Sequence, residues 1–166
     1  MLMNSFSFTI EGKPATKKNH GIIARGHAAV LPSKTYKKYA ESFRQQLGEI
    51  IRIRGSRPHF ETGVQITAHY YLENRAHYPD LVGLMQATAD IISDEYAVVN
   101  HRRYLAHEWL LSDDRIIKSW DGTMIAGIDK ERPRVEIQIK KLDTDVATET
   151  DPQIIRILEG KDNGRD

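Results

Sequence analysis

The sequence contains no cysteine, and this absence removes several classes of site at once. A chain without cysteine has no disulfide framework, no thiolate zinc site and no cysteine nucleophile. Long hydrophobic runs are also missing, since no stretch approaches the roughly 20 apolar residues that a membrane helix needs. The N-terminal residues do not show the basic-then-apolar pattern of a secretory signal. We therefore expect a cytoplasmic protein.

Common phosphate-binding and hydrolytic motifs are missing as well. The chain has no Walker-type phosphate loop, no GxGxxG after a strand, no GxSxG and no HExxH. His101 and His107 are six residues apart, a spacing that puts them on different faces of a helix and does not predict a metal site. Arg102 and Arg103 lie between them, either as solvated surface or as phosphate contacts.

The composition of the chain suits one folded domain whose charge is unevenly distributed along the sequence. The chain has 166 residues, of which 40% are hydrophobic and 28% charged, enough for a single core. Residues 1–58 hold eleven Lys or Arg and three Glu, a net charge of +8, whereas the remainder carries a net charge of −7. This division favours a polyanion-binding surface beside a carboxylate cluster, although chance unevenness would give the same totals.

Hydrophobic periodicity predicts four strands and two helices. Alternation of apolar and polar residues predicts strands over 5–10, 64–72, 115–120 and 135–139. A stripe at helical spacing predicts one helix over 33–51 with Ser33 as its N-cap and a second from Asp80 to Ile92. Residues 13–31 fit a loop or an irregular hairpin, and residues 98–111 fit either element type. The order β-α-β-α-β-β indicates an α+β fold with a small mixed sheet.

The C-terminal residues differ in character from the rest. Residues 143–166 contain seven acidic and three basic residues and few apolar ones. This composition predicts a flexible acidic tail with at most one short helix. We therefore expect a domain over 1–142 followed by a tail over 143–166.

Aspartates stand at the boundaries of the predicted elements. Asp80 lies where the second strand leads into the second helix, Asp90 follows on that helix, and Asp113 and Asp114 precede the third strand. Carboxylates that converge at strand ends hold Mg²⁺ for phosphate chemistry in many proteins. A purely structural role is the alternative for each of these aspartates. Asp80 would be a helix N-cap, Asp113 and Asp114 would form a polar turn, and Asp90 would be a solvated surface residue.

Two short motifs and the order of several others carry a family resemblance. The chain reads Pro79-Asp80-Leu81, then Leu84, then Asp90-Ile91-Ile92, and later Ser112-Asp113-Asp114-Arg115. It resembles the RusA-type Holliday-junction resolvases (crossover junction endodeoxyribonucleases) and their phage relatives, which read D-L-D-N-L-x-K-x-x-x-D-A-L and then a D-D pair. Further pieces follow in the family's order, so that the resemblance spans roughly 5–140: Gly12-Lys13-Pro14, Pro32-Ser33-Lys34-Thr35-Tyr36, Ser119-Trp120-Asp121-Gly122 and Arg132-Pro133-Arg134-Val135-Glu136-Ile137.

The resemblance implies a small homodimeric endonuclease that cuts branched DNA with Mg²⁺ or Mn²⁺. Asp80, Asp113 and Asp114 match the metal-binding aspartates, and Asp90 matches the helix aspartate of the motif. A symmetric dimer suits a four-way junction, in which two equivalent strands are cut. The basic residues of the N-terminal region are expected to bind the DNA backbone without sequence preference: Lys13, Lys17, Lys18, Arg25, Lys34, Lys37 and Lys38.

Three positions depart from the family motif. Val82 replaces an aspartate, Gly83 an asparagine and Gln86 a lysine, so that one metal ligand and one cation are missing. Either other residues replace them or catalysis is weak or lost. The candidate acids are Asp90, Asp94, Glu95 and Asp121, and the candidate cation is Lys118. Two alternatives to an active nuclease remain open: a junction-binding protein without catalysis, and a phage interaction module that binds no nucleic acid.

Overall fold

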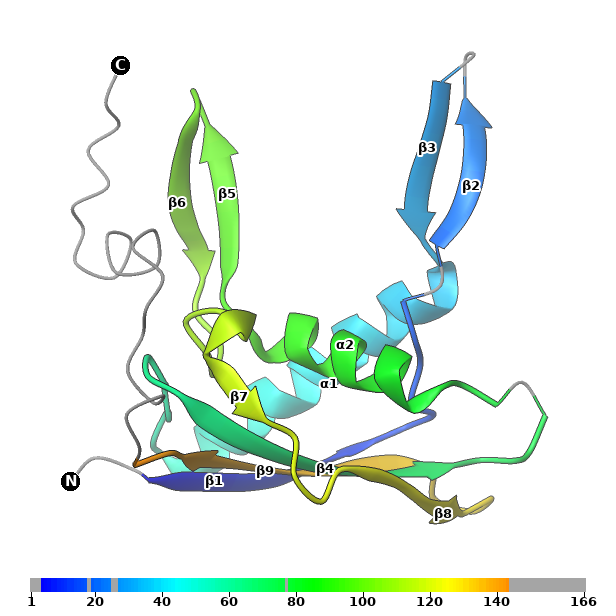
Figure 1. Cartoon of the computed structure of the whole chain (residues 1–166), viewed down its shortest axis with the longest axis vertical. Coiled ribbons are helices and arrows are strands. Elements are labelled where there is room, and N and C mark those ends of the chain that lie inside the picture. The colour runs from blue at the N-terminus through cyan, green and yellow to red at the C-terminus, as the bar shows by residue number, and fades with distance from the viewer. Residues whose placement is uncertain (1–3, 18, 25–26, 77, 144–166) are drawn as a thin grey trace.

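A five-stranded mixed sheet forms the base of the protein, and two helices cover one of its faces (Figure 1). The structure is a computed structural model that describes residues 4–17, 19–24, 27–76 and 78–143. The strands of the sheet are β1 (Ser5–Glu11), β4 (Val64–Leu72), β7 (Ile117–Ser119), β8 (Met124–Ile128) and β9 (Arg134–Lys141). The order is β1-β9-β4-β7, and β8 also pairs with β4. β4 is antiparallel to β9 and parallel to β7 and β8, which confirms the α+β fold with a mixed sheet.

Strict alternation along β4 explains why the sheet buries one face. Val64, Ile66, Ala68, Tyr70 and Leu72 are buried, and the residues between them are only partly covered. Successive side chains of a strand point to opposite faces, so the buried set faces the helices. The core therefore lies between the sheet and the helix layer.

Both predicted helices form, with the predicted caps. α1 spans Lys34–Arg54, and the Ser33 hydroxyl accepts a hydrogen bond from the Tyr36 amide at 3.1 Å. It ends at Gly55, whose φ of 68° is the left-handed conformation that glycine adopts without strain. α2 spans Leu81–Ile92 with Asp80 as its N-cap. Along α1 the apolar stripe is buried, whereas Lys34, Lys37 and Lys38 are exposed on the other face, as predicted.

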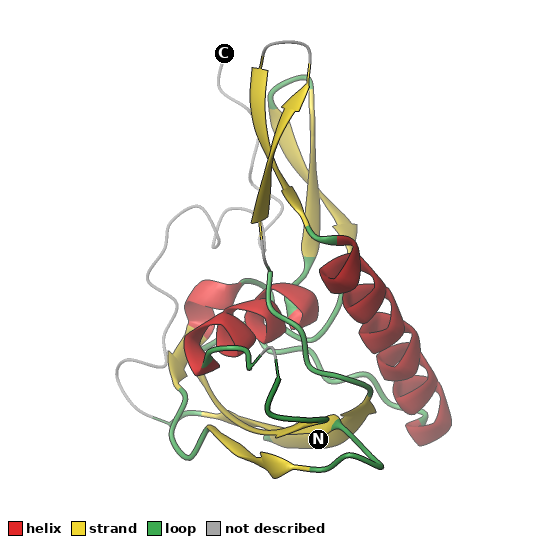
Figure 2. Ribbon diagram, turned by 90° about the vertical axis from the view of Figure 1, so that its right-hand side faces the viewer, coloured by secondary structure: helices red, strands yellow, loops and turns green. Residues whose placement is uncertain are grey.

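Two β-hairpins rise from the helix layer on the side away from the sheet (Figures 1 and 2). β2 (Asn19–Ala24) pairs with β3 (His27–Pro32), which resolves the predicted loop or irregular hairpin. β5 (Glu95–Val99) pairs with β6 (Arg102–His107), which resolves the ambiguous segment as strand. Positive φ angles at Asn100 and His101 fit the tight two-residue turn that joins β5 to β6.

The strand predicted over 115–120 is wrong in its first half. Asp114–Ile116 forms a short 3₁₀ helix, and only Ile117–Ser119 forms strand β7. The Asp113 carboxylate accepts a hydrogen bond from the Arg115 amide at 2.9 Å, and this local bond stabilises a turn in place of a strand.

Some sequence-based predictions lie outside the described residues. These are Lys18, Arg25 and nearly all of the acidic tail, residues 144–166. Among the residues that are described, neither helix has both the length and the apolar character needed to cross a bilayer.

Candidate active site

The chain returns to the C-terminal end of α2 just before the aspartate pair. Leu111 forms a parallel bridge with Ser93, the residue after the helix. The Leu111 carbonyl accepts a hydrogen bond from the Asp94 amide at 2.8 Å. Asp113 and Asp114 follow immediately, so both lie near this end of α2.

Asp113 and Asp114 are adjacent in the chain, and each carboxyl shifts the pKa of the other. The Asp113 carboxylate also accepts hydrogen bonds from the backbone and side-chain nitrogens of Arg115, at 2.9 and 3.1 Å. Burial would raise the pKa of Asp113, but these hydrogen bonds outweigh it and lower that pKa. Partial burial, the hydrogen bond to Asp113 and the charge of Asp113 raise the pKa of Asp114 to about 6. Below neutral pH, Asp114 is therefore the carboxyl that holds a proton, while Asp113 stays ionised.

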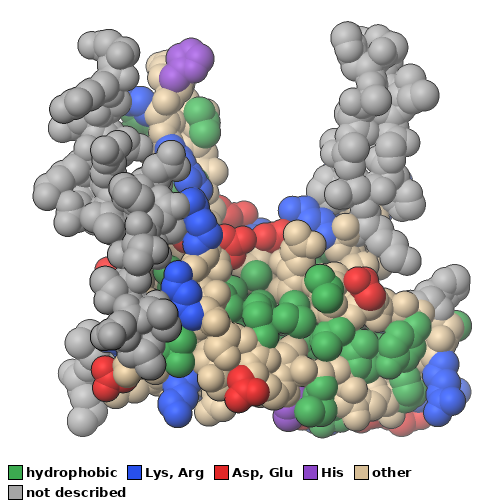
Figure 3. Space-filling model, in the orientation of Figure 1, with side chains coloured by type: hydrophobic (Ala, Val, Ile, Leu, Met, Phe, Trp, Pro, Cys, Tyr) green, Lys and Arg blue, Asp and Glu red, His purple; other side chains and the backbone are tan. Residues whose placement is uncertain are grey.

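Asp90 supplies a third carboxylate to the same region. Its negative charge contributes to the raised pKa of Asp114. Its Oδ2 atom lies 3.1 Å from the ammonium of Lys17, which also sits 5.9 Å from the centre of the Tyr36 ring. Figure 3 shows acidic side chains gathered over the helix layer between the two hairpins, with basic side chains beside them. The structure thus places Asp90, paired with Lys17, within electrostatic reach of Asp114.

Asp80 lies at the opposite end of α2. Its Oδ2 atom accepts a hydrogen bond from the Gly83 amide at 3.3 Å, as an N-cap residue does. Ten residues of helix separate it from Asp90, a rise of about 15 Å. A side chain at Gly83 would place its Cβ 2.6 Å from Asp80 Oδ1, which explains the glycine at this position. The structure does not bring Asp80 together with Asp113 and Asp114.

The capping role of Asp80 gives a stability prediction. Asp80→Ala removes the acceptor for the first turn of α2, and we expect a loss of about 1 kcal/mol in the free energy of unfolding. Asp80→Asn should stay close to wild type, because asparagine caps helices as well as aspartate does. Urea denaturation measures both. An asparagine variant as unstable as the alanine variant would contradict the capping role.

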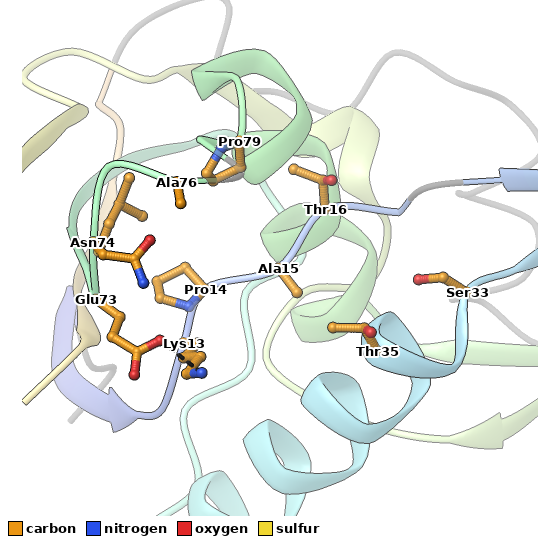
Figure 4. A pocket seen from close by; sticks show the side chains of 11 residues that line it. Lys13, Pro14, Ala15, Thr16, Ser33, Thr35, Glu73, Asn74, Ala76 and Pro79 are labelled. Carbon is orange, nitrogen blue, oxygen red and sulfur yellow. Dashed lines mark ion pairs between the residues drawn. The ribbon is translucent and has the colours of Figure 1, made fainter. Parts of the chain in front are cut away.

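A cavity of about 450 Å³ lies at this same end of α2 (Figure 4). Its walls come from the segment after β1, the loop between β4 and α2, and the start of α1. Lys13 lines it and forms an ion pair with Glu73, at 2.6 Å between Nζ and Oε2. Lys13 therefore lies with Pro79 at the cavity and not with the aspartate pair.

The other acids named from the sequence have structural partners or lie elsewhere. The Asp94 carboxylate accepts a hydrogen bond from the Trp109 amide at 2.7 Å and contacts His59 at 2.9 Å. Glu95 pairs with Arg44 at 2.9 Å. Both thus hold the base of the β5–β6 hairpin. Asp121 is exposed in the turn between β7 and β8, and Lys118 is exposed on β7.

Oxygen donors of the right chemistry for a hard cation are present, but they are not assembled into a coordination site. Within the described ranges, no three His, Asp or Glu side chains form a group that could hold a metal ion. The Asp113–Asp114 pair and Asp90 offer only carboxylate oxygens, the ligands that Mg²⁺ and Mn²⁺ prefer. A divalent cation would also relieve the repulsion of Asp114 by Asp113 and Asp90. The chemistry of these oxygens therefore suits such an ion, although the described side chains do not surround one position.

Sequence reasoning missed two residues that support the pair. Arg115 holds Asp113 through two nitrogens, and its place directly after the pair was the available signal. The Tyr96 hydroxyl donates a hydrogen bond to the Ser112 carbonyl at 2.7 Å, a contact with no signal in the sequence. Comparison with known proteins adds no relative: no family model matches the chain, and neither does any curated protein.

The raised pKa of Asp114 gives a pH prediction. In the unfolded chain, Asp114 loses its proton at about pH 4. In the folded protein it keeps the proton until the pH passes about 6, because its pKa is raised. The stability from this proton is present at acid pH and lost as pH rises through 6. Asparagine at position 114 is uncharged at every pH, so it does not titrate. We therefore expect wild type to lose about 1 kcal/mol relative to Asp114→Asn between pH 5 and 7.5, after solvent screening of this exposed carboxyl.

Urea denaturation of both proteins at the two pH values measures this difference. A constant difference across the range would mean that the pKa of Asp114 is not raised in the folded protein.

Proposed function

We propose that the protein is a metal-dependent endonuclease that cuts branched DNA, with Asp90, Asp113 and Asp114 as its metal-binding carboxylates. The observation that carries this proposal is the Leu111–Ser93 bridge, which brings Asp113 and Asp114 to the end of α2 that carries Asp90. Carboxyl groups held together with perturbed pKa values are typical of functional sites. The resemblance to RusA-type resolvases in the order of motifs supports the same chemistry.

The residues around the pair have separate roles in this proposal. Bound Mg²⁺ or Mn²⁺ would neutralise charge on the phosphodiester and activate the attacking water. Arg115 holds Asp113 in its ionised form. Asp114 would have to lose its proton to bind the ion, and its pKa of about 6 makes this possible near neutral pH. Lys17 balances Asp90 before DNA arrives and is close enough to contact a phosphate that enters.

Exposed lysines on α1 provide a surface for the DNA backbone. Lys34, Lys37 and Lys38 lie on the face of α1 opposite its buried stripe. On the buried stripe of the same helix, Tyr36 contacts Lys17, which pairs with Asp90. A homodimer would present two such sites to the two equivalent strands of a four-way junction.

A second function, junction binding without cleavage, is favoured by one stripe of α2. Val82, Gln86 and Asp90 are spaced at i, i+4 and i+8 and therefore lie along one face of the helix. Val82 is 70% exposed, and Gln86 is exposed as well. Asp90 is the one acidic residue of this stripe, so the stripe offers fewer ligands than the family motif implies.

The test is cleavage of a labelled four-way junction, with linear duplex as the control, in Mg²⁺, Mn²⁺ or EDTA. Symmetric cuts in the junction that require metal support the nuclease. Salt-sensitive junction binding without cuts under any metal supports the second function. Absence of binding at low salt would contradict both, because phosphate contacts weaken steeply only as salt rises.

A further inference from the structure

The β5–β6 hairpin exposes large apolar side chains far from the core. Val98 and Val99 are 71% and 55% exposed, and Tyr104 and Leu105 are 50% and 49% exposed. Folding alone does not require apolar residues at such positions, and grouped exposed apolar residues mark a contact surface. The hairpin therefore has the composition of a binding element.

Both faces of the hairpin carry the same combination of residue types. Val98 is paired with Arg103, and Val99 with Arg102. Paired residues share a face and neighbouring pairs alternate. The same rule places Leu105 on the face of Val98 and Tyr104 on the face of Val99. Each face therefore has one valine, one arginine and one larger apolar residue. The two sets are Val98, Arg103 and Leu105, and Val99, Arg102 and Tyr104. The expected occupant therefore contacts the hairpin from both sides.

The charge of the hairpin identifies the chemistry of that occupant. Residues 97–106 contain two arginines and no acid. Arg103 lies 4.3 Å from the centre of the Tyr96 ring, and neither arginine has an ion-pair partner among the described residues. Two copies of the hairpin packed on each other would bring like charges together. A polyanion that also offers flat apolar surfaces, which is to say nucleic acid, complements the hairpin better.

The hairpin is held firmly beside the candidate active site. Asp94, before β5, accepts a hydrogen bond from the Trp109 amide after β6, which closes the base. Tyr96 bonds to the Ser112 carbonyl, one residue before Asp113. At about 3.3 Å per residue, the five residues of β5 reach about 16 Å from this base, more than the roughly 8.5 Å depth of the major groove.

We propose that the β5–β6 hairpin enters the branch point of the DNA and gives the protein its preference for branched over linear substrates. Val98, Val99 and Tyr104 contact bases that are unstacked there, and Arg102 and Arg103 contact the adjoining phosphates. Apolar side chains flanked by arginine act this way in proteins that open base steps. The inference rests on the proposed function, because it requires that branched DNA is the substrate.

The test uses a four-way junction with 2-aminopurine at the branch, whose fluorescence rises when the base unstacks. Wild type should raise the fluorescence and bind the junction about tenfold more tightly than duplex. Val98→Ser/Val99→Ser should lose the fluorescence gain and most of this tenfold preference while keeping its affinity for duplex, because its charge is unchanged. Tyr104→Ala is the second hairpin variant. Ile53→Ser is the matched control, since Ile53 is 74% exposed on α1, and it should behave as wild type.

The same samples separate failure of this inference from failure of the proposed function. Metal-dependent junction cleavage by wild type, with unchanged fluorescence and preference in both hairpin variants, would overturn the inference alone. No junction binding by wild type would overturn the proposed function and the inference with it. Sedimentation provides a further readout: hairpin variants that lose binding only because a dimer dissociates would assign the hairpin to a subunit contact and overturn the inference.

Discussion

Replacing Asp113 and Asp114 together with asparagine will slow metal-dependent cleavage of a four-way junction by about a thousandfold. Metal coordination in such sites contributes several kcal/mol to transition-state stabilisation, and each 1.4 kcal/mol is a factor of ten in rate. Asparagine keeps the size of both side chains but removes the charge that would attract Mg²⁺. Single-turnover cleavage rates in saturating Mg²⁺ measure the effect.

The fold should survive this double change. The side-chain oxygen of asparagine at position 113 can still accept the hydrogen bond from the Arg115 amide, which stabilises the 3₁₀ turn. The variant should therefore still unfold cooperatively in urea, with a free energy of unfolding that differs from wild type by no more than the roughly 1 kcal/mol expected for position 114, and junction affinity should persist. Cleavage at the wild-type rate by a folded variant would show that these carboxyls are not the metal ligands.

Replacing Lys34, Lys37 and Lys38 with alanine will flatten the salt dependence of DNA binding. Each lost phosphate contact lowers the slope of log affinity against log salt by about 0.9, so three contacts lower it by about 2.7. Between 50 and 200 mM salt, the affinity of wild type should therefore fall by a factor about 40 times larger than the affinity of the variant. Fluorescence anisotropy titrations at several salt concentrations measure the slope.

The matched control replaces three exposed lysines elsewhere, Lys130, Lys140 and Lys141. It removes the same net charge but leaves the α1 surface intact. Its slope should stay close to wild type. An equal loss of slope in the control would mean that net charge, and not the α1 surface, governs binding.

The regular elements were predictable because each has a clear period. The stripe of α1 and the alternation of β4 and β9 are long and uninterrupted, and Ser33 and Asp80 are residues that cap helices. Tertiary packing agrees with these local signals. The helices, these strands and both caps were therefore predicted correctly.

The two hairpins and the first half of the predicted strand 115–120 were not predictable in this way. The β5–β6 hairpin has apolar residues on both faces, so it lacks the alternation of a half-buried strand. At Asp113, a side-chain bond to the Arg115 amide overrides the apolar pattern that follows. Both outcomes depend on contacts that periodicity does not contain.

The grouping of the aspartates depended on tertiary structure as well. Spacing along the chain placed Asp80 and Asp90 on one helix but did not say which end meets Asp113. The bridge between Leu111 and Ser93 decides it, because it brings the chain back to the C-terminal end of α2. A motif match therefore predicted the acidic residues but not the set that comes together.

The most direct test compares single-turnover junction cleavage by wild type, Asp80→Asn and Asp90→Asn, each in Mg²⁺ and in EDTA. If the site lies at the C-terminal end of α2, wild type and Asp80→Asn will cleave at the same metal-dependent rate, and Asp90→Asn will be slower by at least about tenfold. Loss of cleavage in Asp80→Asn with full activity in Asp90→Asn would place the site at the other end of the helix. Absence of metal-dependent cleavage in wild type would contradict the account as a whole.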